Sequence, residues 1–164
     1  SYREVLRLKM VESMVEVYYN SGQFQNLEYL VPQFADAFTF YEKLGAFYEK
    51  KGYSEISHSR MRRYEILLEF LREETDLDAD VAAQHMLYDL YLREKLKKRP
   101  SFAADQKPYE SAVWTYRKKH KISKTAHIEV FPDGTTILFD YENRNPLSNN
   151  AHTETTELDL DNVE

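Results

Sequence analysis

The sequence predicts a mainly α-helical domain that ends in an antiparallel β-hairpin, and two observations carry this prediction. Across residues 1–100, apolar residues recur at intervals of three and four, the spacing of one face of an α-helix. Across residues 127–141, two runs alternate between apolar and polar side chains around Pro132-Asp133-Gly134, a turn whose glycine supplies positive φ. We therefore expect an irregular bundle of about five to six helices followed by the hairpin, and residues 153–160 alternate enough to add a third strand from the tail.

The first two helices are expected before residue 36. The first ends at Asn20-Ser21-Gly22, because glycine readily adopts the left-handed cap, and its apolar face comprises Leu8, Val11, Val15 and Tyr18. A shorter helix spans residues 23–35 and is ended or kinked by Pro32, which cannot donate a backbone hydrogen bond.

Three longer helices are expected to follow and to complete a helical domain over residues 1–100. Thr39 and Glu42 have the spacing of a capping box, and this helix ends at Lys50-Lys51-Gly52. The fourth helix covers Ser59 to Glu74. The fifth begins after Asp76 and Asp78 and continues until Pro100 stops it.

The pattern changes after Pro100. Residues 101–126 form a connector, with a loop, a short helix over 109–120 and a basic stretch over 117–124. Residues 127–164 hold the β-hairpin and an acidic tail, which we expect to pack on or beside the helical domain.

Composition excludes several classes of function. The chain has 164 residues, a net charge of −6, 42% hydrophobic residues and no cysteine. Without cysteine it has no disulfide, no thiolate zinc site and no thiolate ligand for an iron–sulfur cluster. No apolar run approaches the roughly 18 residues of a membrane helix, and no signal peptide opens the chain. The acidic balance argues against nucleic acid, so neither a membrane nor a nucleic acid is expected as a partner.

The densest polar cluster lies at the start of the fourth helix. As a functional site it would bind an anion or contact another domain, because helix N-terminal amides, hydroxyls and guanidinium groups all favour phosphate or carboxylate. In the simpler interpretation, which we favour, Ser57 or Ser59 caps the helix and the arginines pair with acids such as Glu65 and Glu69. The candidate residues are Ser57, His58, Ser59, Arg60, Arg62 and Arg63.

Other candidate sites are weaker. Glu55-x-x-His58 is the unit that di-iron bundles use twice, but the second copy is missing, so we expect no metal site. The basic stretch 117–124 has Trp114 and Tyr116 beside it, as in single-strand nucleic-acid binding, but a solvated connector explains it better in so acidic a chain. No set of residues forms a recognisable catalytic site.

A tetratricopeptide-like protein-interaction module is one alternative for the helical half. Leu44-Gly45, Tyr48 and Gly52 stand where the first helix of such a repeat places its Leu-Gly, Tyr and Gly. The small residues that the second helix needs are absent, and the period misses the roughly 34 residues of this repeat.

Seven stretches of the chain carry a family resemblance, namely 5–24, Ser57-His-Ser-Arg60, 63–70, 88–94, Arg99-Pro-Ser-Phe102, 136–141 and Asn145-Pro-Leu147. They resemble the C-terminal helical region of cobalamin-binding radical SAM proteins, which are Fe–S oxidoreductase-like, and this region is a domain of unknown function. The resemblance runs over residues 3–147 with irregular gaps.

This resemblance implies an accessory, non-catalytic role. In that family a cobalamin-binding domain and a radical SAM barrel with a [4Fe–4S] cluster precede the helical region. The partners implied are therefore the upstream domains of the same chain, and S-adenosylmethionine, the cluster and cobalamin would all be bound there. No cofactor-binding, metal-binding or catalytic residue is expected in this chain itself. Helical periodicity begins within five residues of Ser1, as expected if the chain is cut from a longer one. The alternative explanation of this start is the removal of an initiator Met before Ser1. The oxygen-sensitive chemistry of the family implies a cytoplasmic location.

Overall fold

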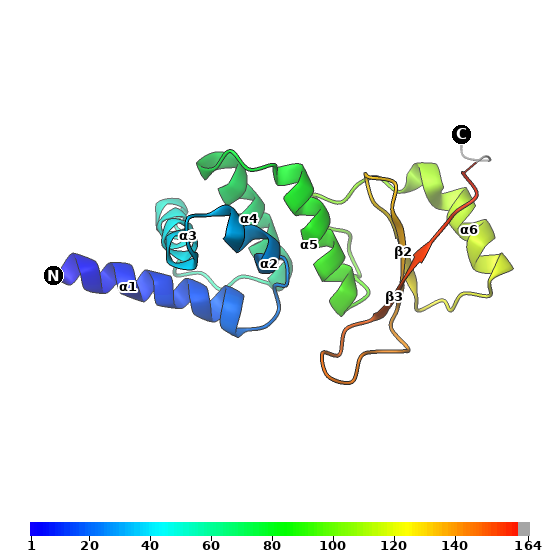
Figure 1. Cartoon of the computed structure of the whole chain (residues 1–164), viewed down its shortest axis with the longest axis horizontal. Coiled ribbons are helices and arrows are strands. Elements are labelled where there is room, and N and C mark those ends of the chain that lie inside the picture. The colour runs from blue at the N-terminus through cyan, green and yellow to red at the C-terminus, as the bar shows by residue number, and fades with distance from the viewer. Residues whose placement is uncertain (161–164) are drawn as a thin grey trace. The chain divides into compact units, whose positions relative to one another are not determined.

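A computed structural model describes residues 1–160 of the chain (Figure 1). The chain divides into two compact units, Ser1–Met86 and the part from Leu87 onward, so the division falls inside helix α5 (Ala79–Arg93). The sequence had suggested a boundary at residue 100. The described part is mainly α-helical with a three-stranded antiparallel sheet near its end, which confirms the predicted fold class and the third strand.

The first unit begins with α1 (Tyr2–Met14), whose N-terminus carries a complete capping box. The Ser1 side chain accepts the Glu4 amide, and the Glu4 side chain reaches back to the N-cap. The helix then widens into a π-helical segment, η1 (Val15–Asn20), which the sequence pattern did not predict. Gly22 follows with φ of 67°, which confirms the expectation that a left-handed glycine ends the first helix.

The segment after Gly22 is shorter than expected. It forms one α-helical turn, α2 (Leu27–Leu30), and a 3-10 turn, η2 (Val31–Gln33), which places Pro32 where a missing amide costs nothing. Its apolar residues are nevertheless core residues, since Phe24, Leu27 and Leu30 are all buried.

Helix α3 (Ala37–Lys51) begins three residues earlier than the sequence suggested, because Asp36 and not Thr39 is its N-cap. The Asp36 carboxylate accepts the Thr39 amide at 2.7 Å, which also lowers the pKa of that carboxyl. Gly45 lets α1 approach closely: a Cβ placed on it would lie 3.3 Å from the Cβ of Met10. Gly52 closes the helix in the left-handed conformation, as predicted.

The core of the first unit is rich in aromatic residues. Helix α4 (Arg60–Glu74) contributes the fully buried Tyr64 and Phe70, and Phe70 packs edge-on against Phe40 and Phe47 of α3. Such edge-to-face contacts add to the burial of the rings themselves. Large side chains of α3 and α4 therefore form the core of this unit. Of the apolar face expected on the first helix, Tyr18 is buried, whereas Leu8 is 56% exposed.

The second unit is built on a sheet with strand order β1-β2-β3, formed by His127–Val130, Thr136–Asp140 and His152–Thr156. Ile128 pairs with Leu138, and His127 pairs with Phe139, so these two pairs point to opposite faces. The Ile128 face is covered by helix α6 (Glu110–Lys119) through Val113 and Tyr116. The Phe139 face packs on Leu87, Tyr91 and Leu92, at the end of α5.

One boundary in this unit was predicted wrongly. Helix α5 ends at Arg93, whereas the sequence suggested that it continues to Pro100. Residues 94–100 instead leave the helix and place Arg99 against β1, where its guanidinium binds the buried carboxylate of Glu129. The chain that leaves the helix is therefore held against the sheet by an ion pair. The 3-10 turn η3 (Lys107–Tyr109) leads into α6, the short helix that had been expected over 109–120.

Candidate functional site

The predicted cluster at residues 57–63 lies at the N-terminus of α4, and most of its polar groups bind other parts of the first unit. Ser59 is the N-cap, and its hydroxyl accepts the Arg62 amide at 3.1 Å. The Nε2 atom of His58 lies 2.9 Å from the carbonyl of Tyr53. Ser57 is exposed and contributes no cap. The cluster is thus anchored to the loop before it.

The three arginines of the cluster point to different neighbours. Arg60 donates to the carbonyl of Gln23 at 3.1 Å, and Arg62 reaches Glu69 at 3.1 Å. Arg63 donates to the hydroxyl of Tyr48 at 3.4 Å. The guanidinium groups therefore do not converge on a common point. Their contacts link α4 to α3 and to the segment after Gly22.

Tyrosine hydroxyls complete this network. Tyr18 of the π-helical segment and Tyr48 of α3 share a short hydrogen bond, and the Tyr18 hydroxyl also donates to the carbonyl of Arg63. Burial, together with the neighbouring Tyr48 hydroxyl, raises the pKa of the Tyr18 phenol well above its ordinary value. Burial also raises the pKa of the Tyr48 phenol, so both phenols are neutral at physiological pH. Chemically this arrangement fixes the packing of α1, α3 and α4.

The first unit also carries an apolar groove of about 800 Å³, which the sequence did not reveal. We define the apolar groove by Val11, Val15 and Tyr19 on the α1 side and Phe24, Val31, Phe38 and Tyr41 on the other. Its lining holds one charged residue, Glu28. Tyr19 is 68% exposed and Phe38 is 44% exposed, so two aromatic rings stand at an open site.

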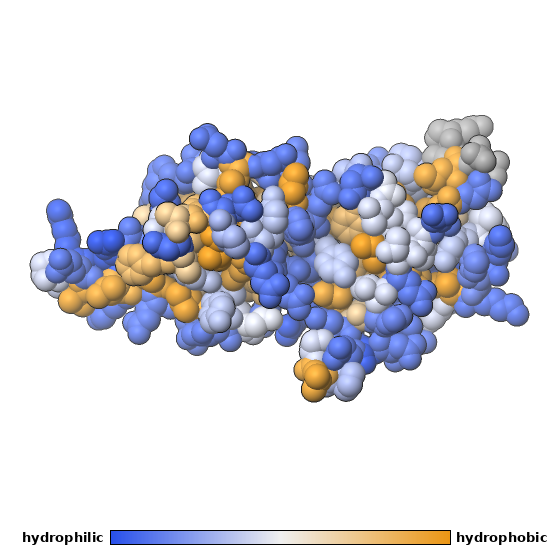
Figure 2. Space-filling view, in the orientation of Figure 1, coloured by the Kyte–Doolittle hydropathy of each residue, from blue (hydrophilic) through white to orange (hydrophobic). Residues whose placement is uncertain are grey.

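The exposed apolar surface continues from the groove along α1. Val5 and Leu8 are 48% and 56% exposed and lie on the same helical face as Val11 and Val15. Figure 2 shows apolar side chains gathered over α1 and the elements beside it. The π-helical segment forms one wall of the groove through Val15 and Tyr19, and such local widening of a helix is frequent at functional sites.

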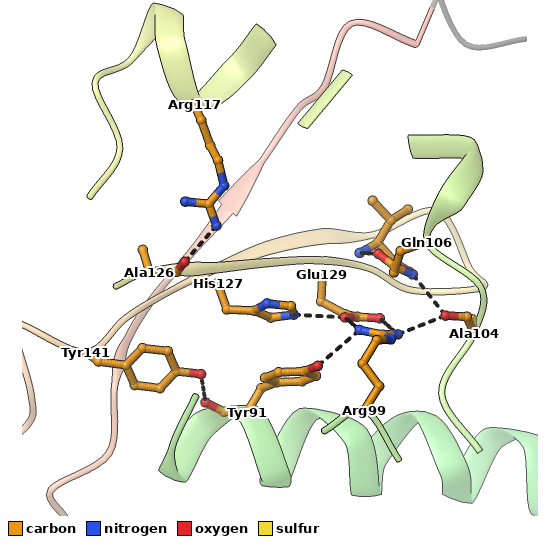
Figure 3. A network of polar contacts seen from close by, with 10 residues as sticks. Tyr91, Arg99, Ala104, Gln106, Arg117, Ala126, His127, Glu129 and Tyr141 are labelled. Atoms are coloured by element: carbon orange, nitrogen blue, oxygen red, sulfur yellow. Dashed lines mark hydrogen bonds and ion pairs between the residues drawn. The ribbon is translucent and has the colours of Figure 1, made fainter. Parts of the chain in front are cut away.

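A second polar network lies in the second unit, around Glu129 of β1 (Figure 3). The Glu129 side chain is fully buried, and Arg99 binds it in a bidentate manner at 2.7 and 3.0 Å. His127 approaches the same carboxylate at 2.9 Å. Arg99 also donates to the hydroxyl of Tyr91 and to the carbonyl of Ala104, so one guanidinium joins α5, a loop and the sheet.

The protonation states in this network follow from burial and contact. Burial alone would raise the pKa of the Glu129 carboxyl, but hydrogen bonds from His127 and Arg99 lower it below its ordinary value. Burial lowers the pKa of the His127 imidazole, whose ring stacks on Tyr91 with centroids 3.8 Å apart. Because a carboxylate only accepts hydrogen bonds, the neutral imidazole carries its proton on Nε2.

Gln106 protects the open edge of β1. Its amide nitrogen donates to the carbonyl of Val130 and its oxygen accepts the amide of Val130, both at 2.9 Å. The side chain thus occupies the place of a neighbouring strand at one position, which keeps that backbone from pairing elsewhere. With Arg99, it fixes the loop over residues 99–106 against the sheet.

These sites differ in what the sequence could reveal. The Ser59 cap and the Arg62–Glu69 pair were among the contacts anticipated for residues 57–63. The Arg99–Glu129 pair was missed, because a charged residue between two apolar ones in an alternating strand is expected to face solvent. Within residues 1–160, the structure contains no group of three or more His, Asp or Glu side chains that could hold a metal ion. No helix in this part of the chain is long and apolar enough to cross a membrane.

Fold and sites together define a mainly helical domain with an open apolar groove and two internal polar networks. A family model described as "Protein of unknown function (DUF4080)" matches residues 1–163, and the chain belongs to this family. Searches of the curated proteins and of the solved structures find no match.

Proposed function

We propose that this chain is the non-catalytic C-terminal accessory domain of a cobalamin-dependent radical SAM protein and that it docks on the radical SAM barrel through the apolar groove. The sequence resemblance over residues 3–147 supports the identity of the parent. The chain has no cysteine, so the [4Fe–4S] cluster would be held by upstream residues, together with S-adenosylmethionine and cobalamin. The oxygen-sensitive chemistry of such a parent favours the cytoplasm.

The apolar groove is the observation that carries the docking proposal. Large exposed apolar patches on soluble domains commonly mark interaction sites. Here Tyr19 and Phe38 are aromatic residues of the kind that dominates interface energies, and they stand beside a lining with a single carboxylate. Docking would bury these rings together with the apolar face of α1. In this position the domain would shape access of substrate to the barrel or recruit a partner to it.

The test uses the full-length parent protein and two variants that each truncate exposed apolar side chains. Tyr19→Ala with Phe38→Ala removes the exposed rings of the groove, whereas Ile56→Ala removes an apolar side chain that is 59% exposed elsewhere in the same unit. Hydrogen exchange is measured across the domain and the barrel. The proposal predicts that hydrogen exchange in the barrel becomes faster in the double variant. In Ile56→Ala the exchange rates of the barrel should stay as in the original protein. Equal exchange in both variants would overturn the proposal.

The identity of the parent has a separate test. The gene read upstream of the codon for Ser1 is expected to encode a Cys-x-x-x-Cys-x-x-Cys motif and a cobalamin-binding domain. A start codon immediately before Ser1, with no such triplet upstream, would contradict the radical SAM assignment while leaving the groove to be explained.

A tetratricopeptide-like interaction module is the second proposal, and the close packing at Gly45 is the observation that favours it. Small residues let neighbouring helices of such an array approach closely, and Gly45 of α3 allows this against Met10 of α1. This proposal predicts that the 164-residue chain alone captures a peptide through the groove. Binding that survives Tyr19→Ala with Phe38→Ala would contradict it.

A further inference from the structure

The second unit concentrates positive charge in an otherwise acidic chain. Between residues 93 and 124 there are 11 Lys and Arg against 3 Asp and Glu, whereas the whole chain has a net charge of −6. We define the lysine patch as the lysines of two segments, 95–98 and 118–124. Its members are Lys95, Lys97, Lys98, Lys118, Lys119, Lys121 and Lys124.

The two segments of the lysine patch meet in space. The ammonium group of Lys95 donates to the carbonyl of Lys124 at 2.7 Å, although 29 residues separate them. The other lysines of each segment lie within six residues of this contact, so short stretches of chain connect them to it. Folding therefore joins two basic runs that are far apart in the sequence.

Two arginines hold the lysine-bearing loops in place. Arg99 binds Glu129 and the carbonyl of Ala104, which fixes the chain directly after segment 95–98. Arg117 donates to the carbonyls of Ser123 and Ala126 at 3.1 and 2.6 Å, which fixes the loop over residues 121–126 (Figure 3 shows the bond to Ala126). The lysine patch is thus presented on a firm support, which reduces the entropy that binding costs.

The charges of the lysine patch are not neutralised within the described part of the chain. None of its seven lysines forms a salt bridge with a carboxylate of residues 1–160, and all seven are exposed. Lys118 and Lys119 stand in the last turn of α6, where cations favour the helix dipole. That effect explains neither the segment 95–98 nor Lys121 and Lys124.

Aromatic rings accompany the lysine patch. Trp114 is 59% exposed, and the ammonium group of Lys118 lies 4.0 Å from its ring centre. The ring of Tyr116 packs on that of His120 at 4.2 Å, one turn along the same helix. An exposed indole beside several ammonium groups without carboxylate partners is a combination with which proteins bind single-stranded nucleic acid, because bases stack on the ring while cations hold the backbone.

We propose that the lysine patch and Trp114 bind single-stranded nucleic acid, with phosphates on the lysines and a base on the indole. The net charge and the isolated stretch 117–124 had argued against nucleic acid. The structure changes that judgement because it brings Lys95 of segment 95–98 into contact with Lys124 of segment 118–124. This site is independent of the apolar groove, so it does not rest on the accessory role proposed above.

The test measures binding of a fluorescein-labelled 12-nucleotide oligo(U) to the full chain by fluorescence anisotropy at different salt concentrations. If about four phosphates are neutralised, the affinity falls about 50-fold between 50 and 200 mM salt. Lys118→Gln with Lys121→Gln is expected to weaken binding and to make the salt dependence shallower. Lys9→Gln with Lys43→Gln is the matched control, since it removes two exposed lysines of the first unit.

The indole distinguishes nucleic acid from other anions. Trp114→Ala is expected to weaken oligo(U) binding about tenfold, without affecting the binding of a poly-glutamate of equal length. Circular dichroism verifies that each variant is folded. The proposal is overturned if oligo(U) does not bind at 50 mM salt or if the patch variant binds as tightly as the control. If poly-glutamate and oligo(U) bind equally tightly and Trp114→Ala affects neither, the lysine patch would instead bind acidic protein partners. This outcome would also overturn the proposal.

Discussion

The chain contains two His-x-Glu pairs on strands, and comparing them isolates the effect of burial. His127 and Glu129 lie on β1 with the carboxylate fully buried, whereas His152 and Glu154 lie on β3 with both side chains more than half exposed. Only Glu129 also binds an arginine, Arg99. Glu129→Gln and Glu154→Gln are therefore the same chemical change in a buried and in an exposed setting.

The expected cost of Glu129→Gln can be worked from these contacts. Removing one partner of a buried ion pair costs about 3–5 kcal/mol, because the remaining charge is left without compensation. The Arg99 side chain is 37% exposed, so water recovers part of this loss and we expect about 2–3 kcal/mol. Glu154→Gln is expected to change the free energy of unfolding by less than about 0.5 kcal/mol.

Urea denaturation followed by circular dichroism measures both variants. With an m-value of about 2 kcal/mol/M, Glu129→Gln lowers the midpoint by about 1–1.5 M, while the midpoint of Glu154→Gln stays within about 0.3 M of the original. Hydrogen exchange should locate the loss in the second unit. If the two variants unfold at the same midpoint, the Arg99–Glu129 pair does not stabilise the sheet as argued.

Two further predictions concern pH and helix packing. Because burial depresses the pKa of folded His127, the unfolded chain binds more protons near pH 6, so stability should fall from pH 7.5 to pH 5. Stability should fall again below about pH 4.5, because the pKa of Glu129 is lowered only in the folded state and the unfolded chain then binds more protons. His127→Gln should flatten the first decline when urea midpoints are measured against pH. A decline that is unchanged in this variant would contradict the role of His127. Gly45→Val should cost about 1–3 kcal/mol by forcing α1 away from α3. The exposed neighbour Ala46→Val should cost no more than about 0.7 kcal/mol, and equal thermal midpoints would refute the close packing.

The fold class was predictable because its signals are local. A helical stripe or an alternating strand records burial every few residues, and the turn at Pro132-Asp133-Gly134 is encoded by its own residues. The Gly22 and Gly52 caps were predictable for the same reason, since few other residues tolerate positive φ.

Features that depend on contacts distant in sequence could not be predicted in this way. The chain after the end of α5 at Arg93 carries Arg99, whose partner Glu129 lies 30 residues later in the sequence. The Asp36 cap replaced the Thr39 capping box because both residues have capping side chains and only the packing of α3 decides between them. The widening of α1 into a π-helix has no signature in the spacing of its apolar residues.

The candidate sites follow the same division. The contacts of Ser59 and Arg62 within α4 were foreseeable from helical spacing. The apolar groove was not foreseeable, because Val11 and Val15 look like core residues, whereas the structure shows them only partly buried and lining the groove. The lysine patch was divided in the sequence between two runs, and only folding brings Lys95 to Lys124.

The central claim is that the apolar groove is the surface that docks on an upstream radical SAM barrel. It is tested most directly by placing the photo-crosslinking residue benzoylphenylalanine at Phe38 in the full-length parent, with the same residue at Ile56 as the control. After irradiation, peptides are mapped by mass spectrometry. The account predicts crosslinks from position 38 to barrel peptides and none from position 56. Crosslinks from position 38 that stay within residues 1–164, or barrel crosslinks from both positions alike, would contradict it.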